Sequence, residues 1–200
     1  ITVSNEDKKD LDIRVRPTSW SQSADGQDNY QDANDLVVFP RRLSLKPGEK
    51  KIIRLGLNNA QTTTEKAYRV YLEEVAPPED PNDASVKLSV LINVGVPVFV
   101  TPAQATPQLT VNPVISNNKL KLELNNQGNA HIRLSRIADD KGNTITSNFT
   151  NRYVFSGVRT VSDIALPASV CNGTGVKWLL ETSESKPIPL NVTLPTRCNS

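Results

Sequence analysis

Short segments in which apolar and polar residues alternate recur along the whole chain, and clusters of Pro, Gly, Asn and Asp separate them. Residues 119–124, with the sequence KLKLEL, are a typical example. Alternation with a period of two residues places the apolar side chains on one face of a β-strand, whereas the period of an α-helix is hardly seen in this chain. Many short alternating segments divided by turn residues are typical of β-sandwiches, so the sequence predicts an all-β fold.

The length of the chain and one proline-bounded segment predict two domains. The 200 residues suffice for two sandwiches of about 100 residues each. Residues 101–107 read TPAQATP, which is the composition of a short and stiff linker. We therefore expect an N-terminal domain over residues 1–101, a linker over residues 102–107 and a C-terminal β-sandwich domain over residues 108–200.

Two cysteines, Cys171 and Cys198, both fall in the second predicted domain. Because no second cysteine pair and no nearby histidine accompany them, they do not form a zinc motif. In an oxidising compartment they would pair, and closing a loop of this length is worth about 3 kcal/mol. The sequence thus favours a Cys171–Cys198 disulfide, with two separate reduced thiols as the alternative.

The sequence lacks the residue patterns of an enzyme, a metal site or a cofactor site. Its only histidine, His131, has no nucleophile motif around it and is interpreted as a structural or surface residue. Neither a glycine-rich phosphate loop nor a metalloprotease or esterase motif occurs. The 23 basic and 21 acidic residues nearly cancel, which gives no reason to expect nucleic acid as a partner. No apolar run approaches about 18 residues, so direct insertion into a membrane is not expected.

Residues 85–100 form the longest predicted strand, with the sequence SVKLSVLINVGVPVFV. Its even-numbered positions from Val86 to Val96 are all apolar and share one face. Such a strand lies either in the centre of a sandwich or at an edge that a partner covers. Pro97 favours an edge or a strand end, because proline has no N–H to donate to a neighbouring strand.

Residues 40–55, with the sequence PRRLSLKPGEKKIIRL, resemble the central signature of the PapD-like periplasmic pilus chaperones. This signature consists of a proline, a short spacer, Leu before Pro-Gly, an apolar pair and Arg-Leu. Three further segments resemble the second, sixth and seventh strands of that family, namely residues 3–5, 68–78 and 85–102. The resemblance covers most of residues 1–102 and is loose beyond Pro107.

The resemblance implies two immunoglobulin-like β-sandwich domains in an L-shaped arrangement, located in the periplasm. A chaperone of this family binds and folds pilus subunits by donor-strand complementation and delivers them to an outer-membrane usher. Its seventh strand, the donor strand, fills the apolar groove of an incomplete subunit. By position, the side chains that fill this groove would be Val86, Leu88, Val90 and Ile92. Pilus subunits and the usher are the implied partners, and neither a cofactor nor a metal is expected.

Two departures from the family pattern concern the anchor for the carboxylate at the end of a subunit. The family's first strand, which carries one basic anchor residue, has no counterpart here because Ile1 already falls in the second strand. Pro97 occupies the place of the lysine that is the other anchor. The arginine-bearing segment at residues 68–71 and the terminal disulfide resemble the archaic, Csu-type branch of the family.

Arg69 is the hypothesised carboxylate anchor of this chain, because a guanidinium group binds a carboxylate bidentately. The alternative for Arg69 is a solvated or structurally paired strand arginine. Arg14 and Arg16 share one strand face and are further candidates, with surface charge as their alternative. The alternative function for the whole chain is that of a structural or adhesive β-sandwich protein, such as a pilin or a surface adhesin.

Overall fold

The computed structural model describes residues 1–58, 62–76, 90–116, 119–166, 173–184, 186–194 and 196. Within these ranges every regular element is a β-strand, which confirms the all-β prediction. No helix among these residues is long and apolar enough to cross a membrane.

The chain divides into two compact units. The first comprises Ile1–Ser21, Tyr30–Gln61 and Lys66–Val100, and the second comprises Gln22–Asn29, Thr62–Glu65 and Thr101–Ser200. The domain boundaries at residues 101 and 108 stay a prediction. Cys171 and Cys198 lie outside the described residues, so the disulfide stays a prediction as well.

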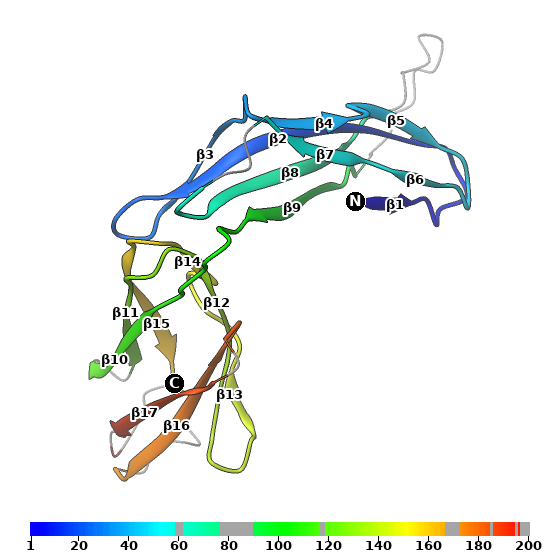
Figure 1. Ribbon diagram of the computed structural model, residues 1–200. Coiled ribbons are helices and arrows are strands. Elements are labelled where there is room, and N and C mark those ends of the chain that lie inside the picture. Colours follow the sequence, from blue (N-terminus) through cyan, green and yellow to red (C-terminus); the bar gives the residue numbers. More distant parts are fainter. Residues whose placement is uncertain are drawn as a thin grey trace. The chain divides into compact units, whose positions relative to one another are not determined.

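Figure 1 shows the order of the strands. Those of the first hundred residues are β1 (Thr2–Ser4), β2 (Leu11–Gln22), β3 (Asp28–Asp32), β4 (Leu36–Phe39), β5 (Arg42–Leu45), β6 (Lys50–Ile52), β7 (Arg54–Leu57), β8 (Lys66–Glu74) and β9 (Asn93–Val100). Those of the second hundred are β10 (Leu109–Ser116), β11 (Lys119–Asn126), β12 (Ile132–Ala138), β13 (Thr144–Thr146), β14 (Tyr153–Val154), β15 (Arg159–Ala165), β16 (Gly175–Thr182) and β17 (Ile188–Thr193).

The first unit is a sandwich of one larger sheet and two strand pairs. The larger sheet has the order β3-β2-β8-β9, with β5 also paired to β2, and the pairs are β1-β6 and β4-β7. Apolar side chains from the two layers meet in one core, because each strand turns every second residue inward. The buried members of this core are Ile13, Val15, Leu36, Val38, Leu43, Leu45, Ile53, Tyr68 and Val70.

The second unit is also built from two sheets. One has the order β10-β11-β15, and the other has the order β13-β12-β16-β17, with β14 paired to β12. The alternating leucines of residues 119–124 point into the core as the sequence predicts, since Leu120, Leu122 and Leu124 are all fully buried. They pack with residues of the opposite sheet such as Trp178 and Leu190.

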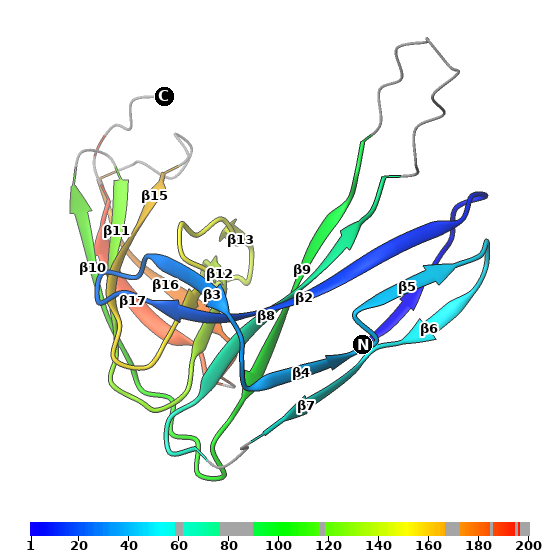
Figure 2. The same cartoon turned by 90° about the horizontal axis from the view of Figure 1, so that it is seen from above.

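The strand β9 begins at Asn93, later than the predicted start at Ser85. Residues 90–92 are described and are not part of a strand, which corrects the prediction for these positions. Among the described residues β9 pairs only with β8, in antiparallel register from Lys66 opposite Val100 to Glu73 opposite Asn93. Figures 1 and 2 show the two strands running side by side. The strand is therefore an edge strand, as Pro97 suggests.

Each unit contains a turn that is organised around one buried asparagine. In the first unit, the Nδ2 group of Asn5 donates to the carbonyl oxygens of Lys9 (2.7 Å) and Leu45 (3.0 Å), and its Oδ1 accepts from the Asp7 N–H (3.0 Å). The backbone N–H of Asn5 donates to Glu49, and its carbonyl accepts from Gly48. Every polar group of this buried residue thus has a partner, as burial requires.

Asn126 repeats the same pattern in the second unit. Its Nδ2 group donates to Ala130 (2.8 Å) and Val154 (2.9 Å), and its Oδ1 accepts from the Gly128 N–H (3.0 Å). Its backbone pairs with Gly157 and Val158, as that of Asn5 pairs with Gly48 and Glu49. Both turn glycines have a positive φ, 76° at Gly48 and 75° at Gly157, a conformation that favours glycine.

Candidate functional site

The direction of the hydrogen bonds along β9 follows from one bond at its start. The Glu74 N–H donates to the Ile92 carbonyl oxygen (2.9 Å), so the backbone groups of Ile92 face β8. In an antiparallel pair this direction alternates from residue to residue. The register shows no shift between β8 and β9, so Val94, Val96 and Val98 also face β8. The backbone groups of Asn93, Gly95, Pro97 and Phe99 then face away from β8, along what we call the outer edge of β9.

Four exposed apolar side chains precede and begin this strand, and three of them lie at alternate positions. Val90, Ile92 and Val94 are 83%, 62% and 48% exposed, and we refer to them as the apolar row. The row continues along β9 into the core of the first unit, against which Val98 and Val100 pack. Val90 and Ile92 are thus exposed, and their role in filling the groove of a subunit stays a prediction; Val86 and Leu88 lie outside the described residues.

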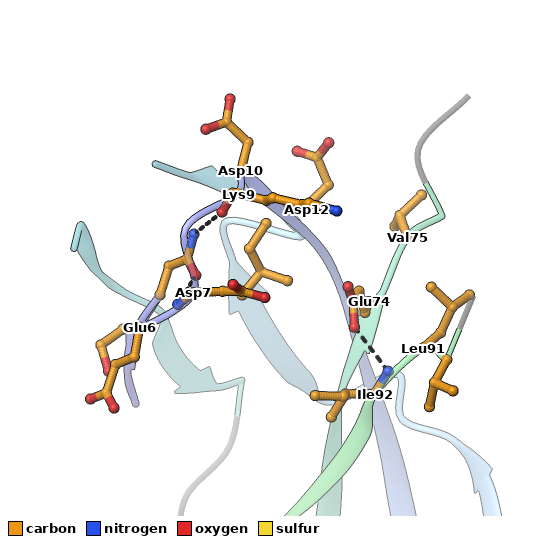
Figure 3. A pocket seen from close by; sticks show the side chains of 13 residues that line it. Glu6, Asp7, Lys9, Asp10, Asp12, Glu74, Val75, Leu91 and Ile92 are labelled. Atoms are coloured by element: carbon orange, nitrogen blue, oxygen red, sulfur yellow. Dashed lines mark hydrogen bonds between the residues drawn. The ribbon is translucent and has the colours of Figure 1, made fainter. Parts of the chain in front are cut away.

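A groove of about 670 Å³ lies at the start of the apolar row. Its walls come from the turn between β1 and β2, from Glu74 and Val75, and from residues 90–92. Figure 3 shows Ile92 and Leu91 across from the acidic residues of that turn, and the bond from the Ile92 N–H to Glu74 Oε2 (3.0 Å). This bond holds the chain just before β9 against the end of β8.

Arg69 lies on the other face of the large sheet, opposite to the buried Tyr68 and Val70, as the alternation predicts. Its ζ carbon is 4.2 Å from the centre of the Trp20 ring and 5.3 Å from that of Tyr30. The two rings stack on each other with their centres 5.9 Å apart. A guanidinium over aromatic faces is held by cation–π attraction and by stacking.

Gly95 provides the space for the stem of Arg69. A Cβ atom at Gly95 would lie 2.9 Å from Arg69 Cδ and 3.2 Å from Arg69 Cγ, which is closer than side chains normally approach. Only glycine at this position of β9 lets the arginine stem cross it at this distance. We call Trp20, Tyr30 and Gly95 together the Arg69 cage. These residues were not predicted from the sequence. One feature of the sequence pointed to this cage, because Trp20 lies on the same strand face as Arg14 and Arg16.

Within the part of the chain that the structure describes, the Arg69 guanidinium forms neither an ion pair nor a hydrogen bond. Its Nε atom is buried and has no hydrogen-bond partner there. A buried donor without a partner costs about 1–3 kcal/mol, and more when it is charged. The group therefore gains from any anion that can reach it.

Arg14 and Arg16 differ from Arg69 because both form a salt bridge with Glu73. Arg14 Nη2 lies 2.7 Å from Glu73 Oε2, and Arg16 Nη2 lies 2.9 Å from Glu73 Oε1. Burial raises the pKa of the Glu73 carboxyl, but the hydrogen bonds and charges of Arg16 and Arg14 outweigh this, and the pKa is lowered. The structure thus places the two further anchor candidates in a local salt bridge.

Replacing Glu73 with Gln is expected to destabilise the first unit by about 1 kcal/mol at pH 7, because two arginines lose their carboxylate. The Glu73 pKa is lower in the folded state, so its contribution is fully present above the unfolded value of about 4.3 and is lost as the pH falls through the folded value. Urea unfolding of the wild type and of Glu73→Gln should therefore differ at pH 7 and converge in acid. A difference that does not depend on pH would contradict this assignment.

His131 lies in the second unit, away from any nucleophile pattern. Its Nδ1 is 2.5 Å from Glu65 Oε1, and its backbone N–H donates to the same oxygen (3.0 Å). The Oε2 atom of Glu65 accepts from Thr101 Oγ1 (3.0 Å). These contacts agree with the structural interpretation of this histidine.

A β-sandwich that leaves one strand edge unpaired beside an exposed apolar row has the features of a protein that binds extended segments of other chains. Residues 1–106 match the PapD N-terminal domain of pili and flagellar-assembly chaperones. This match extends over more than half of the chain, which therefore belongs to that family. Its function is that of a pilus assembly chaperone, and the alternative of a pilin or adhesin is not supported.

Solved structures of fimbrial chaperones share the fold. A chain of the CsuC–CsuE chaperone–tip adhesion subunit pre-assembly complex from archaic Csu pili of Acinetobacter baumannii is 20% identical, with a TM-score of 0.59 over 96% of this chain and 89% of that one. A chain of the SafA pilin–SafB chaperone complex of Salmonella enterica is 18% identical, with a TM-score of 0.60 over 96% and 87%. The class 5 fimbriae chaperone CfaA is 20% identical, with a TM-score of 0.57 over 97% and 90%.

These likenesses extend over both units and confirm the prediction of two immunoglobulin-like sandwiches. A search among curated proteins found no match. Membership of the archaic branch stays a prediction, because likenesses at this level of identity report the fold.

Proposed function

We propose that this chaperone acts in the periplasm, where it holds pilus subunits by donor-strand complementation and delivers them to an outer-membrane usher. The observation that carries the proposal is the outer edge of β9, which is unpaired among the described residues and continues from the exposed apolar row. A subunit strand that pairs with this edge forms backbone hydrogen bonds with β9. The side chains of the apolar row then fill the groove of the subunit. The role is one of binding, without catalysis.

Amide hydrogen exchange in the free chaperone and in its complex with a co-expressed pilin tests this proposal. The N–H groups of Asn93 and Gly95 face outward and should become protected only in the complex. Those of Val94, Val96 and Val98 face β8 and serve as the internal control, since they should be protected in both states. A stable complex in which Asn93 and Gly95 still exchange freely would contradict strand addition at β9.

We further propose that Arg69 binds the carboxylate at the end of the subunit. Of the three candidate arginines, Arg14 and Arg16 already have Glu73 as a partner, whereas Arg69 has no ion pair among the described residues. The Arg69 cage restricts the guanidinium to few orientations, so less entropy is lost when a carboxylate binds. A planar carboxylate is the anion that matches the guanidinium edge.

Replacing Arg69 with Ala is expected to weaken subunit capture by roughly 10- to 100-fold, because a hydrogen bond to a charged group contributes about 1.5–3 kcal/mol. Affinities for the subunit should be measured together with the thermal unfolding of each free variant. Arg14→Ala is the matched control and should leave capture nearly unchanged. Equal capture by Arg69→Ala and the wild type would remove Arg69 as the anchor.

A further inference from the structure

Pro97 lies at an outward-facing position of β9. The bond from the Glu74 N–H to the Ile92 carbonyl sets the alternation, and Pro97 is an odd number of residues further along an unshifted register. The missing N–H of proline therefore costs no hydrogen bond between β8 and β9. It removes a donor from the outer edge instead. A strand that adds there finds the N–H groups of Asn93 and Gly95 but none at Pro97.

The same position lies beside Arg69. Pro97 is the direct register partner of Arg69 on β8, and the stem of Arg69 crosses the neighbouring Gly95. The outer edge of β9 therefore lacks a donor at the level of the Arg69 guanidinium. This guanidinium has no ion-pair partner among the described residues. A positive charge at this level attracts the carboxyl end of a strand and repels an amino end.

We propose that Pro97 is a register stop, which ends the hydrogen-bond ladder of the added strand so that its terminal carboxylate comes to rest at the level of Arg69. The occupant is an extended segment that ends in a free carboxylate and runs parallel to β9, since β9 itself runs from the apolar row toward Val100. This inference rests on the proposed function and adds to it a restriction on the length of the last strand of the subunit. The stop selects subunits whose last strand ends at one position.

The wild type and the variants Pro97→Val and Pro97→Ala test this stop, because both substitutions restore an outward N–H in an extended conformation. The probes are a pilin that co-purifies with the wild type and the same pilin extended by two residues, Gly-Ser, at its carboxyl end. We expect the wild type to bind the extended pilin at least 10-fold more weakly than the natural one. Pro97→Val and Pro97→Ala should bind the two forms with a difference of less than about 3-fold, and the N–H of residue 97 should be protected from exchange in the extended complex.

Three outcomes separate the stop from the function on which it rests. If the wild type and both variants lose the same factor on extension, the register stop is wrong while strand addition stands. If the extension has no effect on the wild type, the stop is wrong as well. If the wild type fails to protect its Asn93 and Gly95 amides with the natural pilin, the proposed strand addition fails, and the stop fails with it.

Discussion

The double substitution Val90→Asp and Ile92→Asp is expected to abolish subunit capture and to leave the chaperone folded. Both side chains are mostly exposed in the free protein, so charges at these positions disturb no core. In a complex they would enter an apolar groove, where each buried aliphatic side chain is worth about 1.5–3 kcal/mol. Loss of two such contacts weakens binding by roughly two to four orders of magnitude, before the added cost of burying charge.

Co-purification with a pilin, followed by affinity measurement, tests this prediction. The matched control is Val37→Asp together with Val161→Asp, because each of these valines is 48% exposed but lies outside the apolar row. The control should unfold at the same temperature as the row variant and should capture subunits like the wild type. If the row variant still co-purifies with the subunit, β9 and the residues before it are not the donor segment.

Replacing Asn126 with Ala is expected to reduce the free energy of unfolding of the second unit by about 3 kcal/mol. The change leaves the carbonyl oxygens of Ala130 and Val154 and the N–H of Gly128 without their side-chain partner. Each buried polar group that loses its partner costs about 1 kcal/mol or more. Asn5→Ala removes the equivalent three bonds and should destabilise the first unit by a similar amount.

The two tryptophans allow the two units to be followed separately, since Trp20 belongs to the first unit and Trp178 to the second. Asn126→Ala should be measured by fluorescence during urea unfolding in a Trp20→Phe background, because a chain with two units need not unfold in one step. Asn112→Ala is the control, since its amide is exposed and bonds only Glu123 Oε2 (3.0 Å). A change at Asn126 no larger than that at Asn112 would show that the asparagine-centred turn is dispensable.

The strand faces of the candidate site could be predicted from the sequence, because the period of two is a local property of a strand. Tyr68 and Val70 are buried and Arg69 lies on the opposite face, as expected. The start of β9 was predicted too early, since alternation by itself does not report where pairing with β8 begins. The asparagine-centred turns were not predicted, because the partners of Asn126 come from residues 128, 130 and 154, and no repeated sequence motif links them to those of Asn5.

The selection among the arginines depended on residues that are distant in the sequence. Arg14 and Arg16 have an ion-pair partner because β2 and β8 place Glu73 beside them, 59 and 57 residues further along the chain. Arg69 is enclosed by rings from β2 and β3, and its stem crosses a glycine from β9. Composition and spacing could not show which of the three candidate arginines has no ion pair among the described residues, since that depends on the register of four strands.

Pro97 has some properties that can be read from the sequence and others that depend on how the strands pair. The missing N–H of this residue and the strand around it could both be predicted from the sequence, because they depend on the covalent chain and its local pattern. The side on which the missing donor lies, and the residue opposite to it, depend on the pairing of β9 with β8, because this pairing sets the alternation. The direction of a backbone group is a property of the sheet, and that direction defines which edge of β9 has no partner among the described residues.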